Sequence, residues 1–246
     1  ERAISQSLFP LIPPAARAYD GVYEITDALE RFYTLFARRH YHPGARLATE
    51  LEQFGHLVAR SARDTSTALH SSHLLFMAIS DTLLGPEDEL ELRLAAIDAC
   101  HQRSSDDFDT VLLRSSQALE ALSDLKKLIQ NSLSYTQALR FFANNILGPD
   151  WSYREIALRE APAILDNVHD LLLEHAELTK YAKRILESER NRFSTQAFRE
   201  IMGLPVARRQ PMKPFIINHI ACLYEWAYRL EHQASWLDKL SGPKMW

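Results

Sequence analysis

The most constraining feature of this sequence is a long interior stretch, residues 87–147, that contains neither Gly nor Pro. These two residues are the usual interruptions of a helix, because Gly is too flexible and Pro removes a backbone hydrogen bond. One continuous helix over the stretch would be about 90 Å long at ~1.5 Å per residue. Its weak point is 103–107, where Ser and Asp side chains offer caps for a new helix. One helix and two helices therefore both remain open.

The few helix breakers elsewhere divide the chain into three arms. Gly85-Pro86 and Gly148-Pro149 each predict a sharp turn between antiparallel neighbours. The chain has just 7 Gly in 246 residues, which disfavours β-sandwich and Rossmann-type folds. The arms predicted in this way cover roughly 22–84, 87–147 and 151–241.

Proline also marks the two ends of the helical region. Pro10, Pro13 and Pro14 predict that residues 1–21 form an extended lead-in. Residues 22–246 would then form a single elongated helical domain. A linker is expected within it at 203–214, after a helix that runs to about Met202.

Mostly apolar residues recur at spacings of four and three positions, a pattern called a seam below. The seam of the first arm is Ile25, Leu29, Phe32 and Phe36, followed by Leu47, Leu51, Phe54, Val58, Thr65, Leu69, Phe76, Ile79 and Leu83. Ser61 and Ser72 fill the remaining core positions of this seam. The seams of the third arm are Ile164, Val168, Leu171, His175, Leu178, Ala182 and Ile185, then Ile216, Ile220, Leu223, Ala227, Leu230, Ala234 and Leu237. This spacing is typical of coiled coils rather than of a broad globular face. It predicts an all-α, long antiparallel three-arm helical coiled-coil bundle.

The motifs of common enzymes and metal sites are absent from the sequence. There is no nucleophile elbow, no Walker loop and no Glu-x-x-His pair of the di-iron type. We expect His175 to lie in a seam and the other histidines to lie on the surface. Cys100 and Cys222 are expected to be small core residues. We therefore expect no enzymatic activity, no cofactor and no metal site.

Composition narrows the possible partners. The net charge of −4 disfavours a dedicated nucleic-acid binder. No apolar run is long enough to span a bilayer. The chain begins without Met or a signal-type segment, so we expect a fragment of a longer cytosolic protein.

Charge is unevenly distributed along the chain. Residues 87–111 carry eight acidic and two basic residues, whereas 176–215 carry nine basic and four acidic ones. A basic segment attracts an anionic membrane at about 1 kcal/mol per well-placed Lys or Arg. It can equally pair with the acidic segment of a neighbouring helix or subunit. The charges alone leave these two hypotheses near even.

Two stretches carry a resemblance to the BAR domain of sorting nexins. They are Leu83-Leu84-Gly85-Pro86-Glu87-Asp88 with His101-Gln102-Arg103, Asp107-Phe108 and Leu112-Leu113, and Glu189-Arg190-Asn191-Arg192-Phe193 with Phe198 and Trp236. The resemblance implies a crescent-shaped dimer, homo- or heterodimeric through the helical seam. It also implies a cytoplasmic scaffold, peripheral on endosomal membranes, that binds or shapes them during protein transport.

These observations predict a dimeric membrane-associated scaffold that contacts an anionic membrane surface through basic side chains. The candidate membrane-binding residues are Lys126, Lys127, Lys180, Lys183, Arg184, Arg190 and Arg192. The alternative is a helical protein-interaction module, a tether or adaptor subunit, that makes no lipid contact. A helical enzyme or ligand-binding bundle with a buried pocket is a more distant third hypothesis.

Overall fold

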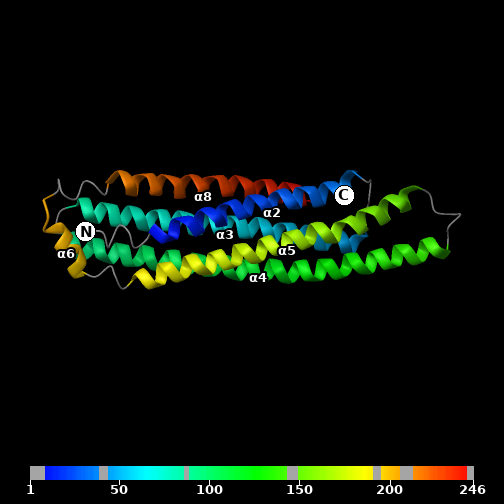
Figure 1. Ribbon diagram of the computed structural model, residues 1–246, viewed down its shortest axis with the longest axis horizontal. Helices are drawn as coiled ribbons and strands as arrows, with labels where there is room; N and C mark the ends of the chain where they lie inside the picture. The colour runs from blue at the N-terminus through cyan, green and yellow to red at the C-terminus, as the bar shows by residue number, and fades with distance from the viewer. Residues whose placement is uncertain are drawn as a thin grey trace. The chain divides into compact units, whose positions relative to one another are not determined.

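The computed structural model describes residues 9–38, 44–85, 89–142, 149–190, 195–205 and 213–242. Nearly all of these residues are helical and none of them lies in a strand, which confirms the all-α class. The three-arm, BAR-like arrangement stays a prediction. The elements, in chain order (Figure 1), are η1 (Phe9–Leu11), α2 (Ile12–Arg38), α3 (Ala45–Leu84), α4 (Leu90–Phe142), α5 (Pro149–Arg190), α6 (Thr195–Met202) and α8 (Lys213–Ser241).

The extended lead-in expected over residues 1–21 is wrong from residue 9 onward. A short 3-10 turn covers Phe9–Leu11, and α2 begins at Ile12. Pro13 and Pro14 therefore occupy the first turn of α2, where a backbone N–H has no partner within the helix and its loss costs little. These prolines mark the start of a helix rather than a break.

The weak point at 103–107 is not a break, because α4 is one helix from Leu90 to Phe142. Ser104 does not cap a new helix; its side chain is buried and hydrogen-bonded to Ser72 Oγ of α3 at 2.9 Å. The predicted breaks near Gly85 and Pro149 are confirmed, since α3 ends at Leu84 and α5 begins at Pro149. Pro86 and Gly148 themselves lie outside the described residues.

In the third arm, where one helix to Met202 was expected, α5 covers Pro149–Arg190 and α6 covers Thr195–Met202, and residues 191–194 lie outside the described residues. The predicted linker is confirmed at 203–205, which are not helical, whereas 206–212 lie outside the described residues. Pro162 lies inside α5 without ending it.

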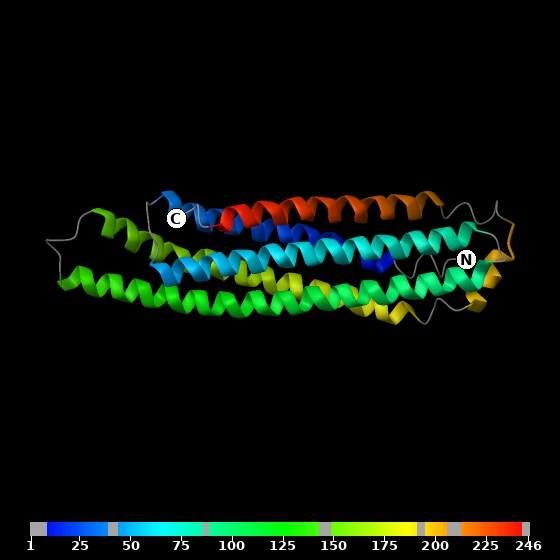
Figure 2. The ribbon, with the colours of Figure 1, turned by 180° about the vertical axis from the view of Figure 1, so that it is seen from behind.

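The chain divides into two compact units, where a single domain over 22–246 was expected. Unit 1 comprises residues 1–20, 63–113 and 176–231, and unit 2 comprises 21–62, 114–175 and 232–246. Each unit takes one part of α2, α3, α4, α5 and α8, so both are built from segments far apart in the sequence. In both units α8 lies along α3 (Figure 2).

Large aromatic side chains fill the interior of unit 2. Phe32, Tyr33 and Phe36 of α2 and Phe54 of α3 are all fully buried. The Phe32 ring meets the Phe36 ring edge to face, with centroids 5.1 Å apart. The Tyr33 hydroxyl donates a hydrogen bond to the Leu51 carbonyl at 2.7 Å, and burial strongly raises its pKa. The seam predicted over Ile25 to Phe36 is confirmed.

Smaller and more polar side chains share the interior of unit 1 with its apolar residues. Besides the Ser72–Ser104 pair, the Ser66 hydroxyl donates to the Ala227 carbonyl of α8 at 2.6 Å. These bonds satisfy hydroxyl groups that would otherwise cost free energy when buried.

The seam predicted for α3 is buried throughout, but the buried face is broader than a coiled-coil seam. At several steps the neighbouring residue is buried as well, as Gly55, Ala59 and Ala62 show. The physical reason is that α3 has more than one neighbour in a unit. In unit 2 it contacts α2 through Leu51 and α8 through His56.

The seam predicted for α5 is correct at four of its seven positions. The buried positions are Val168, His175, Ala182 and Ile185, whereas Ile164, Leu171 and Leu178 are only half-buried. The residue that follows each of these three in the sequence is buried instead. The buried series is Ala161, Leu165, Val168, Leu172, His175, Thr179, Ala182 and Leu186.

Candidate interaction sites

Three of the candidate membrane-binding residues of unit 1, Lys180, Lys183 and Arg190, contact acidic side chains of the same chain. Lys183 of α5 binds the Asp109 carboxylate of α4 at 2.5 Å and lies 3.3 Å from Glu187. The hydrogen bond to Asp109 raises the pKa of Lys183. Lys180 binds Glu177 at 2.6 Å, and this contact lowers the pKa of Glu177.

Arg190, at the end of α5, makes a forked contact with α4. Its guanidinium donates to the Asp98 carboxylate at 2.9 and 3.1 Å and to the Gln102 side chain at 2.8 Å. Farther along the chain, Arg199 of α6 binds Glu91 of α4 at 3.0 Å. Three cations of the basic segment 176–215 therefore pair with three acids of the segment 87–111, as the second charge hypothesis expected.

The remaining candidate membrane-binding residues lie in unit 2, at an exposed position of α5 or outside the described residues. In unit 2, Lys126 of α4 binds Asp166 of α5 at 2.7 Å, and Lys127 binds Asp124 one turn away at 3.0 Å. Arg184 is exposed on α5, and Arg192 lies outside the described residues. Within each unit, the described candidate lysines and Arg190 take part in ion pairs rather than forming a row of unneutralised charge.

Among the described histidines, one departs from expectation. His175 is buried in the α5 seam as predicted, and burial lowers its pKa to about 4. His101 was expected on the surface, but it is buried on the inner face of α4 at 2 % exposure. Its Nε2–H donates to the Leu186 carbonyl at 2.6 Å, and burial is the main cause of its lowered pKa. His101 lies seven positions before the buried Phe108, and this heptad spacing in the sequence could have predicted that His101 is buried.

Neither the other histidines nor the cysteines assemble a metal site in the described part of the chain. His70 and His73 of α3 stack on each other and lie against the Tyr224 ring of α8. Among the described residues, no three His, Cys, Asp or Glu side chains gather in a cluster suited to a metal ion. Cys100 is half-buried and Cys222 is exposed, so the core position expected for Cys222 is wrong.

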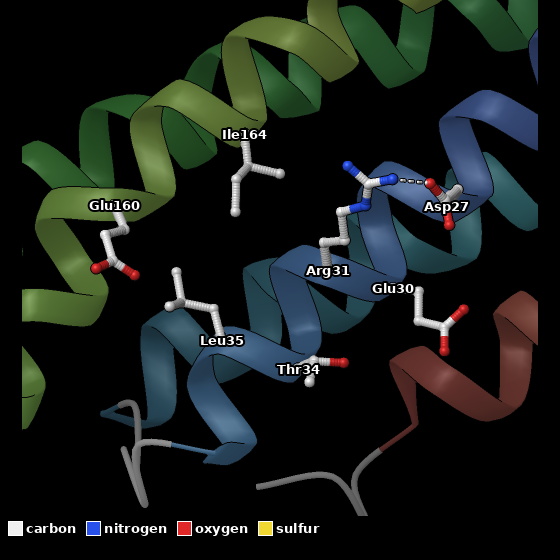
Figure 3. A pocket seen from close by; sticks show the side chains of 7 residues that line it. All are labelled: Asp27, Glu30, Arg31, Thr34, Leu35, Glu160 and Ile164. Atoms are coloured by element: carbon white, nitrogen blue, oxygen red, sulfur yellow. Dashed lines mark hydrogen bonds and ion pairs between the residues drawn. The ribbon is translucent and has the colours of Figure 1, made fainter.

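A groove between α2 and α5 in unit 2 was not predicted from the sequence. It consists of two adjoining hollows, shown in part in Figure 3. Leu35 of α2 and Ile164 of α5 point into the space between the two helices (Figure 3). The residues lining the two hollows are Glu24, Asp27, Ala28, Glu30, Arg31, Thr34, Leu35, Glu160, Ala163, Ile164, Asn167 and Leu171.

The groove combines an apolar floor with an acidic rim. Leu35, Ile164 and Leu171 are half-buried and rest on the aromatic core of unit 2. The rim carries four carboxylates and one cation, Arg31, which is bound to Asp27 on its own helix at 2.5 Å. Such an arrangement suits an apolar ligand that also carries positive charge, because its charges would meet carboxylates while its apolar part covers the floor.

Comparisons with known protein families, with curated proteins and with solved structures give no match. Within the described residues, no helix has the length and apolar character needed to cross a bilayer.

Proposed function

We propose that this chain is a non-enzymatic helical protein-interaction module, a tether or adaptor subunit whose contacts with partners are made by helix faces. The observation that carries the proposal is the α2–α5 groove, where half-buried Leu35, Ile164 and Leu171 are left at the surface of a well-packed core. Grooves between helices that expose apolar side chains are common docking sites for partner helices.

Membrane binding through the basic residues is the second candidate function, and the ion pairs weigh against it. A cation attracts an anionic surface most effectively when no nearby carboxylate offsets its charge. Lys183 and Arg190 each have such a carboxylate within 3 Å on α4. The sorting-nexin resemblance is the support that remains for this function, and dimerisation through a helical seam is compatible with both candidates.

Co-sedimentation with vesicles distinguishes the two functions. The protein would be mixed at about 0.05 M salt, where screening is weak, with vesicles of phosphatidylcholine alone or containing phosphatidylserine. We expect the protein to stay in the supernatant in both cases. We also expect Lys180→Glu with Lys183→Glu to lower the free energy of unfolding, because the second substitution would place a carboxylate opposite Asp109.

Binding of the wild-type protein to the anionic vesicles, together with weaker binding of the double variant, would contradict the adaptor proposal. It would restore the membrane scaffold as the better function. Light scattering of the same preparations tests the associated prediction that the chain forms a dimer, which a monodisperse monomer would contradict.

A further inference from the structure

We infer that the α2–α5 groove of unit 2 docks one basic amphipathic helix of a partner protein. This inference rests on the proposed interaction function and specifies the chemistry of the partner. The register of the apolar residues, the charge of the rim and the length of the groove support it.

The apolar residues of the groove repeat at the spacing that a docked helix requires. On α5, Ile164 and Leu171 are seven positions apart and therefore share one helix face. On α2, Ala28 and Leu35 have the same separation. Two such rows, lying side by side on neighbouring helices, form the holes that receive the apolar side chains of a third helix in coiled-coil packing.

The internal packing of unit 2 explains why these residues are available. Leu165, Val168 and Leu172 supply the α5 contacts to the core. Ile164 and Leu171 each precede one of these buried leucines in the sequence. They therefore lie beside the buried row on the surface of α5. The sequence pattern assigns both residues to a buried seam, and the chain by itself covers them only in part.

The rim selects the charge of the occupant. Glu24, Asp27 and Glu30 of α2 and Glu160 of α5 outnumber Arg31, which is already bound to Asp27. Carboxylates at this density repel nucleic acid and anionic lipid, whereas they attract Lys and Arg side chains beside an apolar stripe. A partner protein segment with a basic face is the occupant that satisfies both the floor and the rim.

The groove has the length of a short helix. Its lining runs from 24 to 35 on α2 and from 160 to 171 on α5, with the low numbers of one helix opposite the high numbers of the other. At ~1.5 Å per residue this corresponds to about 16 Å, or about three turns of a docked helix. An isolated helix of that length is marginal in water, so we expect the segment to become helical on docking.

Binding of a designed peptide tests this inference. The probe is a fluorescein-labelled peptide of about 18 residues with Leu at four-three spacing and with Lys and Arg beside the Leu stripe. Fluorescence anisotropy with the full chain is expected to show saturable binding that weakens as salt is raised. A peptide of the same composition in scrambled order, which has no apolar stripe, is expected to bind at least tenfold more weakly.

Two variants identify the site, and one variant serves as a matched control. Glu24→Lys with Glu30→Lys reverses two charges of the rim, and Ile164→Ser removes apolar floor from a half-buried position. Each variant is expected to bind the designed peptide at least tenfold more weakly than the wild-type protein does. Glu120→Lys changes an exposed carboxylate on α4 that does not line the groove, and it is expected to leave the affinity within twofold.

Circular dichroism and urea unfolding of each variant show whether the fold is retained. Equal binding of the designed and scrambled peptides, or unchanged affinity in the rim variant, would overturn the inference. If the wild-type protein instead forms a dimer that the rim variant dissociates, a second copy occupies the groove and the partner-protein inference fails. Vesicle binding by the wild-type protein contradicts the proposed function separately, because that assay does not involve the peptide.

Discussion

Unit 2 and unit 1 are built from parts of the same long helices, yet their interiors differ in chemistry. Four aromatic side chains, Phe32, Tyr33, Phe36 and Phe54, are fully buried in unit 2. In unit 1, the interior includes a hydrogen-bonded serine pair between α3 and α4 and the Ser66 hydroxyl, which donates to the Ala227 carbonyl of α8. Ion pairs between α4 and the helices α5 and α6 then cross its surface.

The difference shows how one helical architecture can be stabilised in two ways. Burial of large apolar side chains contributes about 1.5–3 kcal/mol per residue and has little directionality. A buried hydrogen bond contributes less, but a buried donor or acceptor left without a partner costs free energy. Buried hydrogen bonds therefore favour the one alignment of the helices in which every polar group is paired. We therefore expect unit 2 to supply most of the stability and the surface ion pairs of unit 1 to depend on salt.

The largest expected effect is the loss of a core aromatic residue from unit 2. Phe32→Ala should lower the free energy of unfolding by about 3–5 kcal/mol, because it leaves a cavity in a close-packed interior. Phe141→Ala is the control, since Phe141 is 80 % exposed and its replacement should change stability by less than about 0.5 kcal/mol. Similar urea midpoints for the two variants would contradict this assignment of the core.

The next effect is a loss of stability in acid that depends on the buried histidines. The folded-state pKa of His175 lies near 4, below the unfolded value near ~6.5. Its contribution is therefore complete above pH ~6.5 and is lost as the pH falls toward about 4, by up to ~3 kcal/mol. His101 shifts in the same direction.

Urea unfolding between pH 7 and pH 4 measures this contribution. The variant His175→Leu should lose less stability than the wild type over that interval, and His101→Leu provides the parallel measurement for unit 1. An unchanged pH dependence in both variants would show that other groups control the acid response.

A smaller effect is expected at the serine pair of unit 1. Ser104→Ala removes one partner of the 2.9 Å contact, whereas Ser72 keeps its bond to the Ala68 carbonyl. The free energy of unfolding should fall by about 1 kcal/mol. Replacing both serines by alanine should add little further loss, and strictly additive losses would argue against a direct Ser72–Ser104 bond.

The smallest expected effect belongs to the surface ion pairs of unit 1. A double-mutant cycle with Arg190→Ala and Asp98→Ala should give a coupling of about 0.2–1 kcal/mol, because both side chains are partly exposed. The coupling should shrink when salt is raised to about 0.5 M. A coupling that does not respond to salt would show that the pair is shielded from solvent, contrary to the structure.

The helical class, the positions of the main breaks and most of the buried faces follow from the amino-acid sequence alone. The scarcity of Gly and the four-three repeats are local properties, and backbone hydrogen bonding within a helix responds to them without reference to the rest of the fold. The seams of α3 and of the described part of α8 follow directly from these repeats. The same reasoning located the charge segments 87–111 and 176–215.

Which of two equivalent helix positions faces inward, and which charged side chains form pairs, depends on how the helices pack together. On α5, Leu178 and Thr179 are adjacent, and hydrophobicity favours Leu178, yet Thr179 is the buried one. The choice depends on the helices packed against α5, which no local pattern specifies. The pairing of Lys183 with Asp109 likewise joins residues 74 positions apart. The α2–α5 groove exists for the same reason, because a surface between two helices is a property of their packing and not of either sequence alone.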